Sequence, residues 1–244
     1  MARTHNRVRA VWIGTSGWTY DDWRGPFYPC DVPKKDWLAW YATRFAAAEV
    51  NFSFYRTPSL EAVRAWRAQT PTDFLFAWKA SKFITHWKRL NEQTCQNSLD
   101  LMATRLRALG RKAGPVLFQL PPQFEANRDR LANFLAMLPV RYLYAFEFRH
   151  PSWYARDIIG LLRQHNVSLC LSDHHHAPAP WIATASHVYI RGTDREVATK
   201  TIMRTAPYWS GQITFANGVG KGRRSSLSST MIKKAPHLSM RGAS

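Results

Sequence analysis

Short apolar runs alternate regularly with longer segments of helical periodicity along most of the chain, and this pattern leaves few possible folds. The apolar runs are rich in Val, Leu, Phe and Ile and lack strict polar alternation, as expected for strands buried on both faces. The pattern predicts seven such strands, at Val11–Gly14, Ala47–Asn51, Phe74–Lys79, Pro115–Gln119, Leu143–Glu147, Ser168–Asp173 and His187–Gly192.

Between these runs, apolar residues recur at helical spacing on one stripe of each segment. The predicted helices are Lys35–Phe45, Leu60–Gln69, Ser98–Leu109, Arg128–Leu138 and Arg156–His165, and Ser59 is a good N-cap for the second of them. Repeated strand–helix–strand units imply a parallel sheet with right-handed crossovers.

The length of 244 residues suits one barrel, since eight parallel strands in about 250 residues is typical of the TIM (β/α)8 fold. An open doubly wound sheet is the alternative, but no G-x-G-x-x-G or Walker A sequence is present. We therefore predict an α/β TIM-type barrel that is one strand short.

Several motifs resemble, in order, those of one family. The segments are GTSGWTYDDWRGPFYP, EVNFSFYRTPS, FLFAWKASKFITH, LFQLPPQF, FEFRHPSW and VYIRG. As a set they are similar to the domain of unknown function 72 family, also called YecE-like, over about residues 11–192. The resemblance implies a TIM barrel with a site at the strand ends, and it implies no reaction.

The active site of such a barrel is built from the carboxyl ends of its strands. Ionisable groups are dense at the predicted ends. The predicted catalytic residues are Glu49, Glu147 and Lys79, and the predicted substrate-binding residues are Trp18, Tyr20, Asn51, Tyr55, His86, Gln119, Arg149, Trp153, Asp173 and Arg191.

The roles of the two glutamates stay open at this point. A charged carboxylate on an apolar strand is costly unless it is paired or liganded. Buried ion pairs with Arg149 and Arg191, general acid–base catalysis, and a divalent-metal site completed by Asp173 and a histidine all satisfy that requirement.

Lys79 also has more than one possible role. It ends an apolar run, so a Schiff base, an ion pair with Glu49 and the binding of an anionic substrate are each open. The adjacent histidines His174–His176 point different ways and do not easily bind one ion, so the cofactor stays unknown, with a divalent metal as one option.

Trp18 and Trp153 are expected to stack on a sugar or nucleobase whose phosphate is anchored by Lys79, Arg149 and Arg191. The predicted function is an enzyme that acts on a polar anionic or nucleotide-like small molecule. A nucleic-acid-binding protein, a metal-dependent phosphodiesterase-like barrel and a non-functional product are the alternatives, and the oligomeric state is left open.

The charge distribution separates residues 193–244 from the rest. Of the net charge of +18, residues 1–192 carry +11, from 25 basic and 14 acidic side chains, and residues 193–244 carry +7, from 9 and 2. We predict two regions: a barrel domain at 1–192 and a basic, Ser/Thr-rich tail at 193–244, disordered or poorly packed, that lacks the eighth strand.

The family resemblance implies a continuation with R-G-H-G, a tyrosine-containing loop, a helix and a strand ending in F-D-N-D. Read one base out of frame, the codons from Gly192 onward can encode H-G-P-G-G-R-Y-K-D-H-Y-A, and those from Arg224 onward can encode V-F-V and F-D-N-D-Q-K-S-A-A. We therefore hypothesise a one-base deletion near the Gly192 codon. Loss of the eighth strand would leave two unpaired barrel edges and a poorly soluble product.

The expected location is the cytoplasm, without a membrane. No run approaches the roughly 20 apolar residues of a membrane span, and the first residues lack a secretory pattern. The three cysteines, Cys30, Cys95 and Cys170, lie far apart and suggest neither a metal cluster nor a disulfide set.

Overall fold

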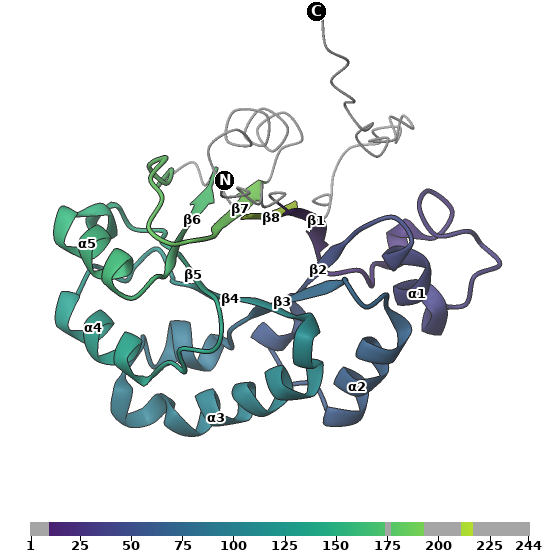
Figure 1. Cartoon of the computed structure of the whole chain (residues 1–244), viewed down its shortest axis with the longest axis horizontal. Helices are drawn as coiled ribbons and strands as arrows, with labels where there is room; N and C mark the ends of the chain where they lie inside the picture. The colour runs from purple at the N-terminus through teal and green to yellow at the C-terminus, as the bar shows by residue number, and fades with distance from the viewer. Residues whose placement is uncertain (1–9, 174–176, 193–210, 217–244) are drawn as a thin grey trace, which may run out of the picture.

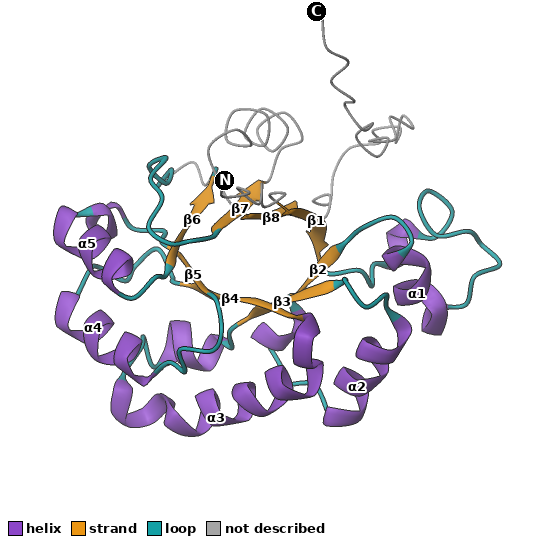
Figure 2. Ribbon diagram, viewed as in Figure 1, coloured by secondary structure: helices purple, strands orange, loops and turns teal. Residues whose placement is uncertain are grey.

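Eight parallel strands form a closed barrel in chain order, with helices outside it (Figures 1 and 2). The structure is a computed structural model that describes residues 10–173, 177–192 and 211–216. The strands are β1 (Ala10–Ser16), β2 (Ala47–Val50), β3 (Leu75–Lys79), β4 (Ala113–Gln119), β5 (Tyr144–Glu147), β6 (Ser168–Ser172), β7 (Val188–Gly192) and β8 (Gly211–Ala216). The predicted α/β barrel is thus confirmed.

The eighth strand corrects the prediction that the barrel is incomplete. Strand β8 pairs in parallel with β7 on one side and with β1 on the other, for example Thr214 with Ile190 and with Ile13. The search for continuous apolar runs missed this strand because Ile213 and Phe215 alternate with polar or small residues. Since both neighbouring edges are paired, the reason for expecting poor solubility no longer holds.

Five α-helices occur at the predicted segments, with bounds that differ most for α1 and α3, and lie outside the barrel along the side that includes β2 to β5 (Figure 2). They are α1 (Trp37–Ala42), α2 (Leu60–Gln69), α3 (Glu92–Leu109), α4 (Arg128–Met137) and α5 (Arg156–Gln164). As predicted, Ser59 caps α2, where its hydroxyl accepts a hydrogen bond from the backbone N–H of Ala62 at 3.1 Å.

Helix α3 begins six residues before its predicted start. The side chain of Asn91 accepts a hydrogen bond from the backbone N–H of Thr94 at 3.2 Å and so caps the helix. The first turns of α3 are largely polar, and a search for apolar periodicity therefore starts the helix too late.

The core has two layers with different compositions. Between strands and helices lies a large cluster that is rich in aromatic side chains, among them Trp37, Trp78 and Phe118. A smaller cluster fills the barrel interior and consists of Ala47, Ala77, Leu117, Ala145, Cys170 and Tyr189. Because most of the interior side chains are small, the barrel has room for long polar side chains above them.

In the part of the chain that the structure describes, no helix combines the length and the apolar character that crossing a bilayer requires.

Candidate functional site

The site is built by strand alternation at the carboxyl ends of the strands. Successive side chains of a strand point to opposite faces, so the residue two positions after an interior residue also faces the interior. Ala47, Ala77, Leu117, Ala145 and Tyr189 lie in the interior cluster, and two positions later come Glu49, Lys79, Gln119, Glu147 and Arg191. The sequence thus changes from apolar to polar as each strand reaches the mouth of the barrel.

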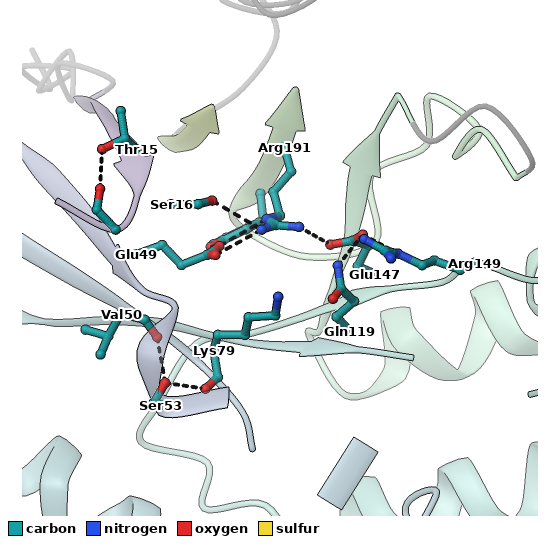
Figure 3. Close-up of polar contacts among 12 residues, drawn as sticks. Thr15, Ser16, Glu49, Val50, Ser53, Lys79, Gln119, Glu147, Arg149 and Arg191 are labelled. Carbon is teal, nitrogen blue, oxygen red and sulfur yellow. Dashed lines mark hydrogen bonds and ion pairs between the residues drawn. The ribbon is translucent and has the colours of Figure 1, made fainter. Parts of the chain in front are cut away.

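Arg191 on β7 is the centre of this polar layer (Figure 3). Its guanidinium donates to both carboxylate oxygens of Glu49, from Nε at 3.1 Å and from Nη2 at 3.0 Å. Nη1 donates to Oε2 of Glu147 at 2.7 Å, and Nη2 also donates to the hydroxyl of Ser16 at 3.2 Å. One buried cation therefore joins carboxylates from β2 and β5 across the barrel.

Glu147 is held from three sides. Besides Arg191, its Oε1 accepts from Nε2 of Gln119 at 2.7 Å and from Nε of Arg149 at 3.0 Å. Burial alone would raise the pKa of this carboxyl, but the two guanidinium groups and the amide outweigh burial and lower the pKa to about 2. Glu147 is therefore an ionised carboxylate at neutral pH.

Lys79 on β3 is placed differently. Its side chain is buried and points toward the Arg191 group, with Glu49 on one side and Gln119 on the other (Figure 3). The described ion pairs of both glutamates go to Arg191 and Arg149, so the ion pair with Glu49, one of the open roles of Lys79, is not formed. Instead, its Nζ lies 4.6 Å from the ring centroid of Phe54.

This environment makes the Lys79 amine easier to deprotonate. Burial, together with the positive charge of Arg191, outweighs the attraction of the two carboxylates and lowers the pKa of Lys79 from 10.5 to about 8. Lys79 is thus a buried amine that changes its charge close to physiological pH.

Three predicted binding residues lie in the connections that follow β1, β2 and β3. Asn51 follows β2, and its buried Oδ1 accepts no hydrogen bond from any described group. The ring of His86 lies 5.0 Å from Phe54, and burial, with the charge of Lys79, lowers the His86 pKa to about 4. Tyr20 donates its hydroxyl hydrogen to the backbone carbonyl of Ser16 at the end of β1.

Other predicted residues lie away from the charged layer. Trp153 is fully buried, stacks on Phe148 at 4.8 Å and donates to the backbone carbonyl of Phe124 at 2.6 Å. This corrects its expected place as a wall for a ligand, because apolar packing has taken the ring into the core. Trp18 is half-buried and packs edge-on against Trp66 at 5.3 Å.

Two positions stand at the border of the site. Tyr55 is 77% exposed and lies outside the polar layer, and Asp173 is half-buried directly after β6.

Sequence reasoning missed Tyr189 as a member of the site. The hydroxyl of Tyr189 donates to Oε2 of Glu49 at 2.7 Å. Burial and the neighbouring carboxylate raise the pKa of Tyr189 well above its usual value, so it keeps its proton. The signal was present, because Tyr189 precedes Arg191 by two residues and must share its face of β7.

The metal hypothesis gains no support from the described residues. No group of three His, Cys, Asp or Glu side chains within them is arranged to hold an ion. His174–His176 lie outside the residues that the structure describes. Instead, the charge of each glutamate is paired with at least one guanidinium group.

Fold and site together define a parallel (β/α)8-type barrel with a buried, charged layer at the carboxyl ends of its strands. The family model described as "Protein of unknown function DUF72" matches residues 12–214, and the chain belongs to this family. The match continues well past Gly192, where we expected agreement to stop.

Curated relatives agree with this assignment. The chain is 31% identical over 147 residues to the UPF0759 protein YecE of Escherichia coli (strain K12), which covers 60% of this chain and 51% of the relative. It is 26% identical over 155 residues to the UPF0759 protein YunF of Bacillus subtilis (strain 168), covering 59% and 52%. Each alignment thus spans about half the length of the relative.

Solved structures support the fold. A DUF72 family protein from Thermotoga maritima superposes with a TM-score of 0.74 at 23% identity, covering 85% of this chain and 92% of that one. The crystal structure of SacUVDE superposes with a TM-score of 0.51 at 7% identity, covering 84% and 91%. At these identities the likeness concerns the fold alone.

The change of reading frame near Gly192 stays a prediction. Of the predicted tail, residues 211–216 form β8, and the remainder lies outside the described residues. Sequencing the gene around the Gly192 codon tests the hypothesis, and a single frame with no alternative coding for a barrel end would contradict it.

Proposed function

We propose that this protein is an enzyme in which Lys79 transfers a proton to or from a polar anionic or nucleotide-like small molecule bound at the mouth of the barrel. The observation that carries the proposal is the contrast at the mouth between fully paired carboxylates and a buried lysine without an ion pair to either of them. A general acid or base works best when its pKa lies near the working pH, and a pKa of about 8 meets that condition.

The glutamates then have a supporting role. Glu49 and Glu147 hold Arg191, and the three cations Lys79, Arg149 and Arg191 exceed the two carboxylates by one charge. That excess favours an anion at the mouth.

Two further groups suit substrate binding. Arg149 is 28% exposed and uses its Nε for Glu147, so its terminal nitrogens suit an anionic group of the substrate. The buried Oδ1 of Asn51 suits a hydrogen-bond donor, because a buried acceptor is rarely left unpaired.

The lysine chemistry is testable without knowing the substrate. Competitive acetylation with acetic anhydride, followed by mass spectrometry of the Lys79 peptide, should give a half-maximal reactivity near pH 8. Solvent-exposed lysines, which titrate near about 10.4, serve as the internal reference. A Lys79 midpoint at or above that reference would contradict the proposal.

A panel of phosphorylated and carboxylated small molecules then tests catalysis. We expect Lys79→Arg to keep anion binding and to lose about 100-fold or more in turnover, since a guanidinium stays protonated. Lys79→Met should lose both. Salt-sensitive binding of nucleic acid that survives Glu49→Gln and Glu147→Gln, with no turnover of any panel member, would favour a nucleic-acid-binding protein instead.

A further inference from the structure

A second concave site lies on the helix side of β3, beside the charged mouth. It is a cavity of about 320 Å³ between the connections that follow β2 and β3 and the helix α3. Its size is at the lower end of the range of small-molecule sites. Its walls include the five aromatic side chains of Phe54, Tyr55, Trp78, Phe83 and Trp87.

Two of these rings are unusually open to solvent. Tyr55 is 77% exposed and Trp87 is 67% exposed, although each carries a large apolar surface. The two buried rings, Phe54 and Trp78, continue the same wall inward. Exposed aromatic side chains gathered around a cavity are typical of a surface that binds something flat and apolar.

The charge of the cavity has one sign. Lys82 is the one charged side chain among its described lining residues, and its Nζ lies 6.0 Å from the ring centroid of Trp87. Nearby, Lys88 Nζ lies 5.4 Å from the ring centroid of Phe83. A ligand that stacks on these rings would therefore have an ammonium group beside it, which favours a negative substituent.

The backbone that carries this wall has an uncommon conformation. Residues Phe83–Trp87 form a π-helical turn, and Arg89 and Leu90 follow with φ angles of 47° and 62°. Two successive non-glycine residues in the left-handed region cost free energy, and both π turns and such strained residues occur often at binding sites. The turn places Phe83 and Trp87 on the cavity wall.

We propose that this cavity binds an aromatic anion: a small molecule with one planar ring system, stacked against Trp87 and Tyr55, and one negatively charged group beside Lys82. The site is separate from the charged layer. Phe54 belongs to the cavity wall and also lies against Lys79, so it marks the border between the two sites. The proposal does not depend on catalysis at Lys79.

Adenosine 5′-monophosphate is the probe, because it combines a ring and a phosphate, and isothermal titration calorimetry on the full chain is the measurement. Adenosine lacks the charge and ribose 5-phosphate lacks the ring, so each should bind about tenfold or more weakly than the monophosphate.

Trp87→Ala should weaken binding of both adenosine and the monophosphate by about tenfold or more, the range found for base–aromatic stacking. Lys82→Met should remove the preference for the monophosphate over adenosine. Trp181→Ala is the matched control, since Trp181 is 58% exposed and lies in the connection between β6 and β7. It should leave all three affinities unchanged.

Three results would overturn the inference. They are no binding of the monophosphate to the wild-type chain, equal affinity for ribose 5-phosphate, and full affinity in Trp87→Ala together with loss in Lys79→Met. The last result would move the ligand into the charged mouth and leave the proposed function standing. Circular dichroism of each variant confirms that an affinity loss is not a loss of folding.

Discussion

The buried charges on the two sides of the barrel mouth differ in whether they form ion pairs. Around Arg191, every described charge has partners: Glu49 accepts from one guanidinium and one phenol, and Glu147 accepts from two guanidinium groups and an amide. On β3, Lys79 is also buried, but its Nζ lies against the ring of Phe54 and forms no described ion pair with either carboxylate.

The difference separates charges that hold the structure together from a charge that is available for chemistry. Glu147 has a lowered pKa and Arg191 a raised one, so each of these two paired groups keeps one protonation state at neutral pH. Burial without an ion pair disfavours the charged form of an amine and lowers its pKa. This lowers the stability of the fold, but it suits proton transfer near neutral pH.

Replacing the central cation should have the largest effect. Arg191→Leu leaves Glu49 and Glu147 buried with one counter-charge fewer each, and we expect a loss of about 3–5 kcal/mol in the free energy of unfolding. Denaturant unfolding measures it. Arg128→Leu is the control, because Arg128 belongs to a surface pair with Asp129 at 3.6 Å and should cost less than about 1 kcal/mol. Similar losses in both variants would show that the buried cluster is not structural.

Acid should lower the free energy of unfolding by protonating Glu147. The folded pKa is lowered from 4.5 to about 2, so the stabilising contribution is complete above about pH 4.5 and is lost as the pH falls toward 2. In that window the wild-type chain should take up about one proton more on unfolding than Glu147→Gln. The slope of the free energy of unfolding against pH measures this proton uptake. Parallel curves for the two proteins would contradict the pairing.

Removing the unpaired charge should have a smaller effect, of the opposite sign. Lys79→Met eliminates the cost of a buried ammonium, and we expect the free energy of unfolding at pH 7 to rise by about 1 kcal/mol or more. Lys35→Met, at an exposed lysine, should change it by less than about 0.5 kcal/mol. A destabilised Lys79→Met protein would mean that Lys79 contributes to the fold like the paired charges.

The same lysine predicts the alkaline behaviour. Its folded pKa is lowered to about 8 from 10.5, so between these values the unfolded chain holds the proton more often than the folded one. In this window the free energy of unfolding of the wild type should therefore rise with pH relative to that of Lys79→Met. If the difference between the two stability curves does not change with pH, the Lys79 pKa is not shifted.

Much of this fold was predictable because its elements carry strong local patterns. Seven strands and five helices follow the predicted segments, and α2 has the predicted bounds. The elements that were missed or misplaced have weak apolar signals: in β8 the apolar residues alternate with polar or small ones, and α3 starts with polar turns that Asn91 caps. The candidate site was predictable at the level of strand ends, since alternation puts Glu49, Glu147 and Arg191 inside.

Strand period and apolar composition are local properties of the chain, so they already specify that charged side chains end the apolar strands of a parallel barrel. The partners of these charges depend on the folded barrel. Closing the barrel brings Arg191 from β7 to Glu49 on β2 and Glu147 on β5, although 142 and 44 residues separate them in the chain. The connection after β2 packs Phe54 against Lys79 on the neighbouring strand β3, and so Lys79 titrates while the paired charges do not.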